Sequence, residues 1–396
     1  MTMALDGIRI LDLTRVLAGP FATMLLADLG AEVIKLEVPL TGDDSRQFPP
    51  FQGGESAYFM SINRNKKSLV LNLKSEEGKQ TFLRLVRKCD VLVENFRPGT
   101  MERLGLGYEQ LRMEQPGLIY AAVSGYGQTG PYSQRPAYDA VVQALGGLMS
   151  ITSPEPGGTP TRVGTSIGDI TAGLYTAVGI LAALVERERS GCGQLVDVAM
   201  LDCQVAILEN AVSRYLVTGT APRPIGNRHP SIVPFEPFET LDGQIMLAAG
   251  NDALWHKFCR AAGLEDLLAD PAFGSNANRN EHYNQLRPRI AAAMRQKNVA
   301  EWQALLDEAG IPNGPIQTID QVVQDPQVRA REMLAEIDHP AAGRVTVPGV
   351  PIKLSATPGS VRTPAPCLGE HTEEILAGWL GLSPDEISGL RARGVI

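Results

Sequence analysis

Short apolar runs separated by polar turns dominate the first half of the chain. Six of these runs have the length of buried strands, at residues 8–13, 33–36, 69–73, 91–93, 118–123 and 195–200. Segments with helical periodicity lie between them. Strands that alternate with helices in this way predict an α/β fold built on a parallel sheet.

The predicted helices have identifiable ends. Pro20 can open a helix at its first position, and Gly30 can close it. Ser75 can cap a further helix, whose apolar residues between Phe82 and Cys89 recur on one face. The longest apolar run, residues 170–185, has 16 residues and two glycines, short of the roughly 18 that a membrane span needs. We therefore expect a buried helix there and no membrane anchor.

The pattern changes beyond residue 200, which predicts a second domain. Residues 1–200 are expected to form the N-terminal part of a large α/β domain, and residues 201–225 a connecting helix and loop. Residues 226–325 predict a smaller α+β domain with helices near 255–262 and 299–309. Residues 326–396 are expected to return to the large domain, with a strand near 344–347 and a terminal helix.

Composition narrows the possible functions. Lys and Arg number 36 against 44 Asp and Glu, so the net charge is −8. We expect no nucleic-acid partner, because phosphate binding needs a basic face. The five cysteines form no C-x-x-C pair and no histidine stands at metal-ligand spacing, which favours a reducing compartment and gives no metal site. Residues 1–9 are too polar for a secretory leader, so we expect a cytoplasmic protein.

A glycine-rich segment, Gly125 to Gly130, matches the dinucleotide-binding pattern G-x-G-x-x-G. That pattern requires a helix that opens on the glycines. Pro131 and Pro136 prevent one, so the next helix can begin only near Tyr138. We interpret the segment as a glycine-rich loop near an active site or as a plain turn.

The ends of the predicted strands carry the first candidates for ligand binding, because open α/β sheets bind ligands beyond the carboxyl ends of their strands. Arg15 follows the first strand and Lys74 the third; Asn95 to Gly99 follows the next, with Arg103 a turn later. Guanidinium groups hold phosphate, and Phe96 can stack on a base. Each residue alone is better explained as a solvated charge, but together they predict a site for a phosphorylated, adenine-bearing ligand.

Asp169 stands just before the long apolar helix, in the small-residue segment Gly164 to Ile170. It has two compatible interpretations: a helix N-cap, or a carboxylate nucleophile in a dry pocket. Arg228 and His229 are neighbours in a loop, where Arg228 could receive a carboxylate and His229 is more simply a structural histidine. The chain has no G-x-S-x-G or Walker motif, which argues against hydrolase and kinase chemistry.

Several motifs together resemble those of the class III CoA-transferases, the CaiB/BaiF type. They are the segments Gly7–Leu13, Leu29–Lys35, Asn63–Ser68, Val93–Gly99, Gly168–Asp169 and Leu368–Thr372, and they span nearly the whole chain. The resemblance implies an interlocked, ring-like homodimer whose subunits have a Rossmann-like large domain and a smaller domain. It also implies acyl-CoA and dicarboxylate substrates, with coenzyme A as a substrate and no permanently bound cofactor.

By the same resemblance, Asp169 is the nucleophile that attacks the donor thioester. The acyl group stays activated through an aspartyl anhydride and an aspartyl-CoA thioester, so ATP is unnecessary and water must be excluded. The carboxylate substrates are assigned to Arg15, Arg228 and His229. The CoA contacts carry over to Val16, Leu17, Leu71, Asn72, Lys74, Asn95, Phe96, Arg97, Arg103, Arg135, Ala137 and Tyr138.

Three positions depart from related enzymes. The formyl-CoA transferases of the family have an Arg where Val38 stands and a Gln where Leu17 stands, so an adenine-side and an oxalate-side contact are in question. The related α-methylacyl-CoA racemases use a His where Tyr138 stands, which argues against two-base racemisation here.

The acceptor is predicted from a few shared segments. Arg15–Pro20 and Gly125–Pro131 are most similar to those of family members that move CoA from succinyl-CoA to glutarate, whereas Gly226–Pro230 is closer to oxalate enzymes. We predict a CoA-transferase for succinyl-CoA and glutarate. Oxalate, itaconate or another short diacid is the alternative acceptor, and a racemase is the less favoured alternative class.

Overall fold

The computed structural model describes residues 2–396, whose contacts divide the chain into two compact units. Unit 1 contains the residues up to Leu148, then Arg162–Gly219 and Pro326–Ile396. Unit 2 contains Met149–Thr161 and Thr220–Asp325. The short stretch from Met149 to Thr161 joins unit 2 although no change in the sequence pattern marks it.

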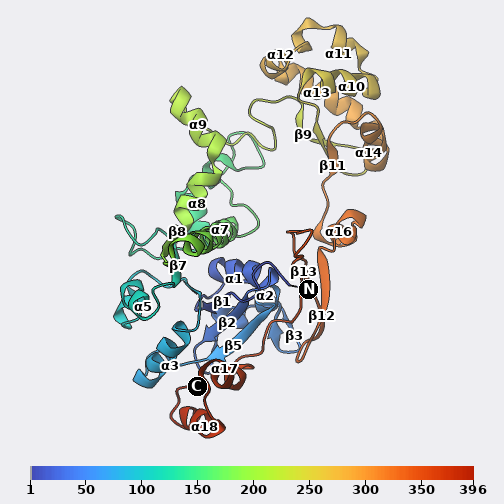
Figure 1. Ribbon diagram of the computed structural model, residues 1–396. Helices are drawn as coiled ribbons and strands as arrows, with labels where there is room; N and C mark the ends of the chain where they lie inside the picture. The colour runs from blue at the N-terminus through green and yellow to red at the C-terminus, as the bar shows by residue number, and fades with distance from the viewer. Residues whose placement is uncertain (1) are drawn as a thin grey trace. The chain divides into compact units, whose positions relative to one another are not determined.

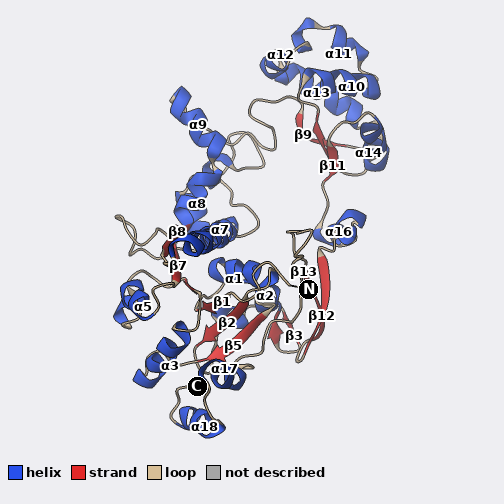
Figure 2. Ribbon diagram, in the orientation of Figure 1, coloured by secondary structure: helices blue, strands red, loops and turns tan. Residues whose placement is uncertain are grey.

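Unit 1 is built on a six-stranded sheet, drawn in red in Figure 2, in which every neighbouring pair is parallel. The strands in spatial order are β5 (Lys66–Val70), β2 (Glu32–Glu37), β1 (Arg9–Asp12), β6 (Val91–Glu94), β7 (Ile119–Ser124) and β8 (Leu195–Ala199). All six predicted strands are present, so the predicted parallel α/β fold is confirmed. Chain order reverses between β1 and β6.

Helices cover both faces of this sheet (Figure 1). On one face, α1 (Ala18–Asp28) and α7 (Ile167–Ser190) share a core with Ile10 and Val91. The opposite core contains Leu11 and Leu92, because successive strand residues point to opposite faces. Five helices contribute to that second core: α3 (Glu76–Val86), α4 (Thr100–Arg103), α5 (Tyr108–Glu114), α17 (Thr372–Leu380) and α18 (Pro384–Ala392).

Local chemistry explains where two of the helices begin. The hydroxyl of Ser75 accepts a hydrogen bond from the N–H of Gly78 at 3.0 Å, so the predicted cap of α3 is confirmed. The predicted start of α1 at Pro20 is wrong by two residues, because the helix begins at Ala18. A proline is tolerated at the third position, since the first N–H groups of a helix have no partner within it.

Helix α7 is 24 residues long and, by length and composition alone, apolar enough to cross a membrane. Half of its most apolar window is nevertheless buried inside the structure. Gly173 packs closely against α1, since a Cβ at this position would lie 2.7 Å from the carbonyl oxygen of Ala18. The helix therefore contributes to the protein core, as its glycines and length in the sequence predicted.

The rest of unit 1 consists of short elements and a hairpin. Strands β12 (Leu334–His339) and β13 (Gly343–Pro348) pair antiparallel, and β13 is the strand predicted near 344–347. The helix predicted after residue 200 is interrupted at Leu208. The short elements are η1 (Asp44–Gln47), β3 (Phe51–Gln52), β4 (Glu55–Ser56), α2 (Ala57–Ile62), α4 (Thr100–Arg103), α6 (Asp139–Leu145), α8 (Met200–Ile207), α9 (Glu209–Thr218) and α16 (Pro326–Ala330).

Unit 2 has its own hydrophobic core, which includes Trp255, Phe258 and Trp302. Its antiparallel sheet has the order β11 (Asn313–Pro315), β10 (Gln244–Ala248), β9 (Phe235–Glu239). The helices predicted near 255–262 and 299–309 are confirmed as α10 (Asp252–Ala262) and α14 (Val299–Glu308). The other helices are α11 (Glu265–Ala269), η3 (Pro271–Phe273), α12 (Asn276–Glu281), α13 (Tyr283–Met294) and α15 (Ile319–Val322).

Candidate active site

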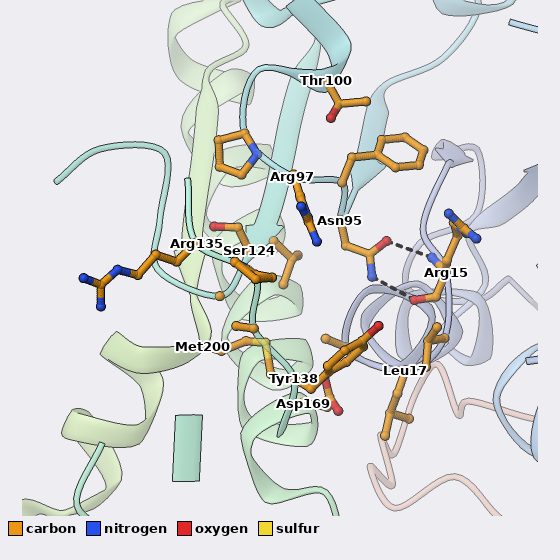
Figure 3. Close-up of a pocket in the computed structure, with 18 of the residues that line it drawn as sticks. Arg15, Leu17, Asn95, Arg97, Thr100, Ser124, Arg135, Tyr138, Asp169 and Met200 are labelled. Atoms are coloured by element: carbon orange, nitrogen blue, oxygen red, sulfur yellow. Dashed lines mark hydrogen bonds between the residues drawn. The ribbon is translucent and has the colours of Figure 1, made fainter. Parts of the chain in front are cut away.

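The reversal of strand order between β1 and β6 creates a switch point, where open α/β sheets bind ligands. Asp12 accepts a hydrogen bond from the N–H of Thr14 at 2.9 Å, and Lys35 donates to the Thr14 carbonyl at 2.8 Å. Asn95, directly after β6, forms two hydrogen bonds of 2.8 Å with the backbone of Arg15 (Figure 3). The two loops at the switch point are therefore tied to each other.

Two cavities of unit 1 open at this edge of the sheet. The first has a volume of about 450 Å³ and is lined by Asp169 at one end. The second has a volume of about 880 Å³ and extends over the carboxyl ends of β1, β2 and β5. Arg15, Phe96 and Thr100 line both cavities, and Figure 3 draws Thr100 far from Asp169. The two cavities together suit an elongated ligand with one end at Asp169.

Positive charge gathers along these walls although the whole chain is acidic, with a net charge of −8. Apart from Lys35, whose ammonium donates to the Thr14 carbonyl, the cations that line one or both cavities are Arg15, Lys74, Arg97, Arg103 and Arg135. Phe96 is partly buried and lines both cavities, where its ring can stack on a base. Guanidinium and ammonium groups around such a ring suit an anionic nucleotide.

Asp169 is the third residue of α7, and Ser166 occupies the N-cap position. The N-cap interpretation of Asp169 is therefore wrong. Within residues 2–396, its carboxylate forms no hydrogen bond or ion pair, and it lines the first cavity. Burial raises the pKa of Asp169 to about 7, and the carboxylate of Asp139 adds to the rise. A partly desolvated carboxylate without a partner is available as a nucleophile.

Asp139, which the sequence did not single out, forms a hydrogen bond with the first turn of α7, the helix that carries Asp169. One of its oxygens accepts a hydrogen bond from the N–H of Gly168 at 2.8 Å, and the other accepts one from Gln143 at 2.8 Å. Gly168 packs tightly, since a Cβ there would lie 2.7 Å from a methyl group of Val142. The available signal was an acidic residue in the first turn of a helix, which is too common to indicate a site.

Tyr58 of α2 is a second residue that the sequence did not reveal. Burial raises the pKa of Tyr58 to about 12, and the carboxylates of Asp169, Asp43 and Asp139 add to the rise. The phenol therefore stays protonated at neutral pH within electrostatic range of Asp169. Helix α2 spans only Ala57–Ile62, too short to leave a clear periodic pattern.

Every residue predicted to contact CoA lines one of the two cavities. Leu71 and Asn72 do so because β5 ends at Val70, earlier than predicted, and the chain then turns across the sheet edge. Val38, which stands where the formyl-CoA transferases have an Arg, also lines the second cavity. This difference from those enzymes therefore lies within the candidate site. The predicted residues of the first cavity are Val16, Leu17, Asn95, Phe96, Arg97, Arg135, Ala137 and Tyr138, and those of the second are Leu71, Asn72, Lys74, Phe96 and Arg103.

The glycine-rich segment after β7 is a loop beside this site. Helix α6 begins only at Asp139, so no helix opens on the glycines and the dinucleotide interpretation fails, as predicted. Gly125 lines the first cavity, and Gly127 donates its N–H to the Ser124 hydroxyl at 2.9 Å. Of the two interpretations left open by the sequence, the loop near the site is the one that the structure favours.

Arg228 and His229 belong to unit 2 and line neither cavity. Arg228 donates to the side-chain oxygen of Asn280 at 3.0 Å, and its guanidinium stacks 3.7 Å from the ring centre of Tyr283. The Nδ1 atom of His229 accepts a hydrogen bond from the N–H of Ser231 at 3.1 Å. The role of these two residues in substrate binding stays a prediction.

The fold and the site define the class: an α/β enzyme with a free carboxylate in one cavity and a second, cation-lined cavity that shares lining residues with the first. Comparison with known protein families agrees, since the model described as CoA-transferase family III matches residues 5–372. The chain belongs to this family. The family and the enzyme class predicted from the motifs are confirmed, and the protein is a CoA-transferase.

Individual relatives share most of the chain. The succinyl-CoA:glutarate CoA-transferase of Mus musculus is 42% identical over 393 residues, which cover 99% of this chain and 90% of the relative. The acetyl-CoA:oxalate CoA-transferase of Acetobacter aceti is 45% identical over 351 residues, 88% of this chain and 89% of the relative. The crystal structure of a CaiB/BaiF family protein from Brucella suis has a TM-score of 0.86 and 36% identity, and the match covers 96% of this chain and 100% of that one.

Proposed function

We propose that this enzyme transfers CoA from succinyl-CoA to glutarate through a covalent intermediate on Asp169. The observation that carries the proposal is the Asp169 carboxylate, which has no partner within residues 2–396 and lines a cavity that adjoins a larger, cation-lined one. The similarity to succinyl-CoA:glutarate CoA-transferases supports the choice of donor and acceptor.

In this proposal the nucleotide end of CoA occupies the second cavity. Lys74 and Arg103 hold its phosphates, and the Phe96 ring stacks on the adenine. The pantetheine arm then passes Arg15 and Thr100, which line both cavities. Its thioester carbon ends beside Asp169.

The reaction proceeds in four acyl transfers at this position. The Asp169 carboxylate attacks the succinyl thioester carbon, which gives a mixed anhydride and CoA thiolate. The thiolate attacks the aspartyl carbonyl and releases succinate, which leaves an aspartyl-CoA thioester. Glutarate attacks that thioester, which forms a second anhydride and releases CoA thiolate, and this thiolate then attacks the glutaryl carbonyl of the anhydride. Glutaryl-CoA leaves and the carboxylate is restored.

Intact-protein mass spectrometry tests the covalent route. Wild type is incubated with succinyl-CoA and hydroxylamine, which converts an aspartyl anhydride or thioester into a stable hydroxamate. We expect one hydroxamate, mapped to Asp169 by peptide sequencing, and none in Asp169→Ala. Glu188→Gln, at the far exposed end of α7, is the control and keeps the wild-type adduct. Full transfer activity in Asp169→Ala would refute the mechanism.

An acceptor panel then tests the substrate. Glutarate is expected to give the highest kcat/KM among glutarate, oxalate, itaconate and mesaconate. A clear preference for oxalate would assign the protein to the other activity found among its relatives. Exchange of the α-proton of a 2-methylacyl-CoA in deuterated water, without any transfer, would support a racemase instead. We expect no exchange, because Tyr138 stands where the racemases have the histidine that exchanges the proton.

We also propose that the enzyme works in the cytoplasm as an interlocked homodimer. Helix α7 exposes large apolar side chains, among them Leu174, Tyr175, Val178 and Val185. Contiguous exposed apolar residues of this kind mark interaction surfaces, and the family resemblance makes a second copy of this chain the occupant.

Light scattering on the purified protein tests this assembly. A mass of twice the chain is expected for wild type, and Val178→Asp should abolish the dimer by burying a charge. Met113→Asp on α5 is the matched control, because Met113 is also exposed and apolar but lies on another helix. A monomeric, fully active wild type would contradict the proposal.

A further inference from the structure

Val16 joins β1 to α1 with a backbone conformation that valine rarely adopts. Its φ is +66°, in the left-handed region, where a β-branched side chain is strained. Such strain persists only where the surroundings fix the conformation, and it concentrates at functional sites. Val16 lines the first cavity between Arg15, which lines both cavities, and Leu17, which lines only the first.

A buried ion pair holds this turn from two sides. The two carboxylate oxygens of Asp43 lie 3.1 and 3.3 Å from the nitrogen of Val16 and accept its N–H. The ammonium of Lys35 lies 2.8 Å from Asp43 and also donates to the carbonyl oxygen of Thr14 at 2.8 Å. The residues before and after Arg15 are therefore both fixed by the same pair.

A gain in the stability of the fold does not explain why the Lys35–Asp43 ion pair occurs at this position. The side chains of Lys35 and Asp43 are 0% and 1% exposed, and the desolvation of buried ions commonly offsets their attraction. Despite burial, Lys35 and the N–H groups of Ser45 and Val16 hold the pKa of Asp43 well below its usual range. The pKa of Lys35 is raised in spite of burial, by Asp43, Asp12 and Glu37. Both members are thus charged at neutral pH.

We propose that Lys35 and Asp43 are positioning residues for CoA transfer. They hold Val16 in its left-handed conformation, and this places Leu17 at the Asp169 end of the cavity and Arg15 at the junction of the two cavities. Both residues border the second cavity, but their charged groups are occupied by the loop. The inference rests on the proposed function, because it requires a thioester to pass along this wall.

A double-mutant cycle tests the inference, with the rate of hydroxamate formation at Asp169 as its readout. We expect Asp43→Asn to lower this rate about 10–100-fold, because small displacements of a positioned substrate cost about that much. Binding of adenosine 3′,5′-bisphosphate, measured by calorimetry, should change less than about threefold, since its contacts lie at Lys74 and Arg103. In the Val16→Gly background the same Asp43→Asn change should cost less than about threefold, because glycine adopts a positive φ without strain.

Asp28→Asn is the matched control. It breaks another buried ion pair of unit 1, with Arg64 at 2.7 Å, which lies outside both cavities. It should lower Tm as Asp43→Asn does, yet keep the rate per folded enzyme. An equal loss of rate in the two variants, or an equal effect of Asp43→Asn in both backgrounds at position 16, would overturn the inference. Absence of any wild-type adduct on Asp169 would instead overturn the proposed function, and the inference with it.

Discussion

The proposed reaction depends on whether the carboxyl group of Asp169 carries a proton. Burial and the charge of Asp139 raise its pKa to about 7, while the attacking form is the carboxylate. The rate of covalent adduct formation should therefore rise with pH and level off above about pH 7. Single-turnover rates with succinyl-CoA, measured from about pH 5 to about pH 9, give the midpoint. A flat profile across this range would contradict the assigned ionisation.

The two causes of that pKa can be separated by substitution. Asp139→Asn removes the neighbouring charge but keeps an oxygen that can accept the N–H of Gly168. The midpoint of the pH profile should fall by about one pH unit or less, because burial is the larger cause and remains. An upward shift would contradict this account. Glu188→Gln, on the same helix as Asp169 but exposed at its far end, should leave the midpoint unchanged.

The same raised pKa has a consequence for stability. A carboxyl whose pKa is higher in the folded than in the unfolded state stabilises the fold at low pH, and this contribution is lost as pH rises towards about 7. Asp169→Asn, which carries no charge, should therefore unfold at a higher temperature than wild type at pH 8. The difference should be on the order of 2 kcal/mol and vanish near pH 4. Thermal unfolding at both pH values measures it, and a less stable variant at pH 8 would count against the burial of Asp169.

At the scale of the element, Gly168 sets how closely α6 and α7 approach. A Cβ at this position would lie 2.7 Å from Val142 and 3.0 Å from the carboxylate of Asp139. Gly168→Ala should push the helices apart, displace Asp169 and lower the single-turnover rate about tenfold or more. Gly164→Ala is the control, because nothing lies within 4 Å of its added Cβ. Equal rates in the two variants would show that helix spacing does not position the nucleophile.

The strands were predictable because their apolar runs report burial, but burial does not fix where pairing ends. Leu71 and Leu73 belong to an apolar run, yet β5 stops at Val70 and these residues line the second cavity. At its other end β5 starts at Lys66, whose buried ammonium contacts Asp12 at 3.0 Å and so interrupts the apolar pattern. Apolar periodicity therefore missed both ends of this strand.

Local sequence patterns also failed to predict part of the candidate active site. Asp169 was a candidate because of its place before a long apolar helix, and a family motif then implied that it is the nucleophile. Asp139 and Tyr58, by contrast, act on it only through the spacing of α6, α2 and α7 in the fold. The left-handed turn at Val16 and its contact with Asp43 likewise join residues 27 positions apart in the chain. Distances of this kind are properties of the packed structure and leave no local pattern in a single sequence.

At the scale of the whole molecule, the net charge of −8 gives no sign of the cation-lined cavity. Arg15, Lys74 and Arg103 line the second cavity and come from the three segments that follow β1, β5 and β6. The free carboxylate of Asp169 lines the other cavity. In the proposed function, ligand binding and bond making are thus separated in space, so their effects on KM and kcat should also be separable.

Substitution at the nucleotide end tests this separation. Lys74→Ala and Arg103→Ala should each raise KM for succinyl-CoA about tenfold and leave kcat close to wild type, because a lost phosphate contact weakens substrate and transition state equally. Both variants should also discriminate less between succinyl-CoA and its 3′-dephospho analogue. Lys88→Ala, an exposed lysine outside both cavities, is the control for a change in overall charge. If kcat fell instead while KM stayed constant, these cations would act on the reacting atoms, and the nucleotide would have to bind elsewhere.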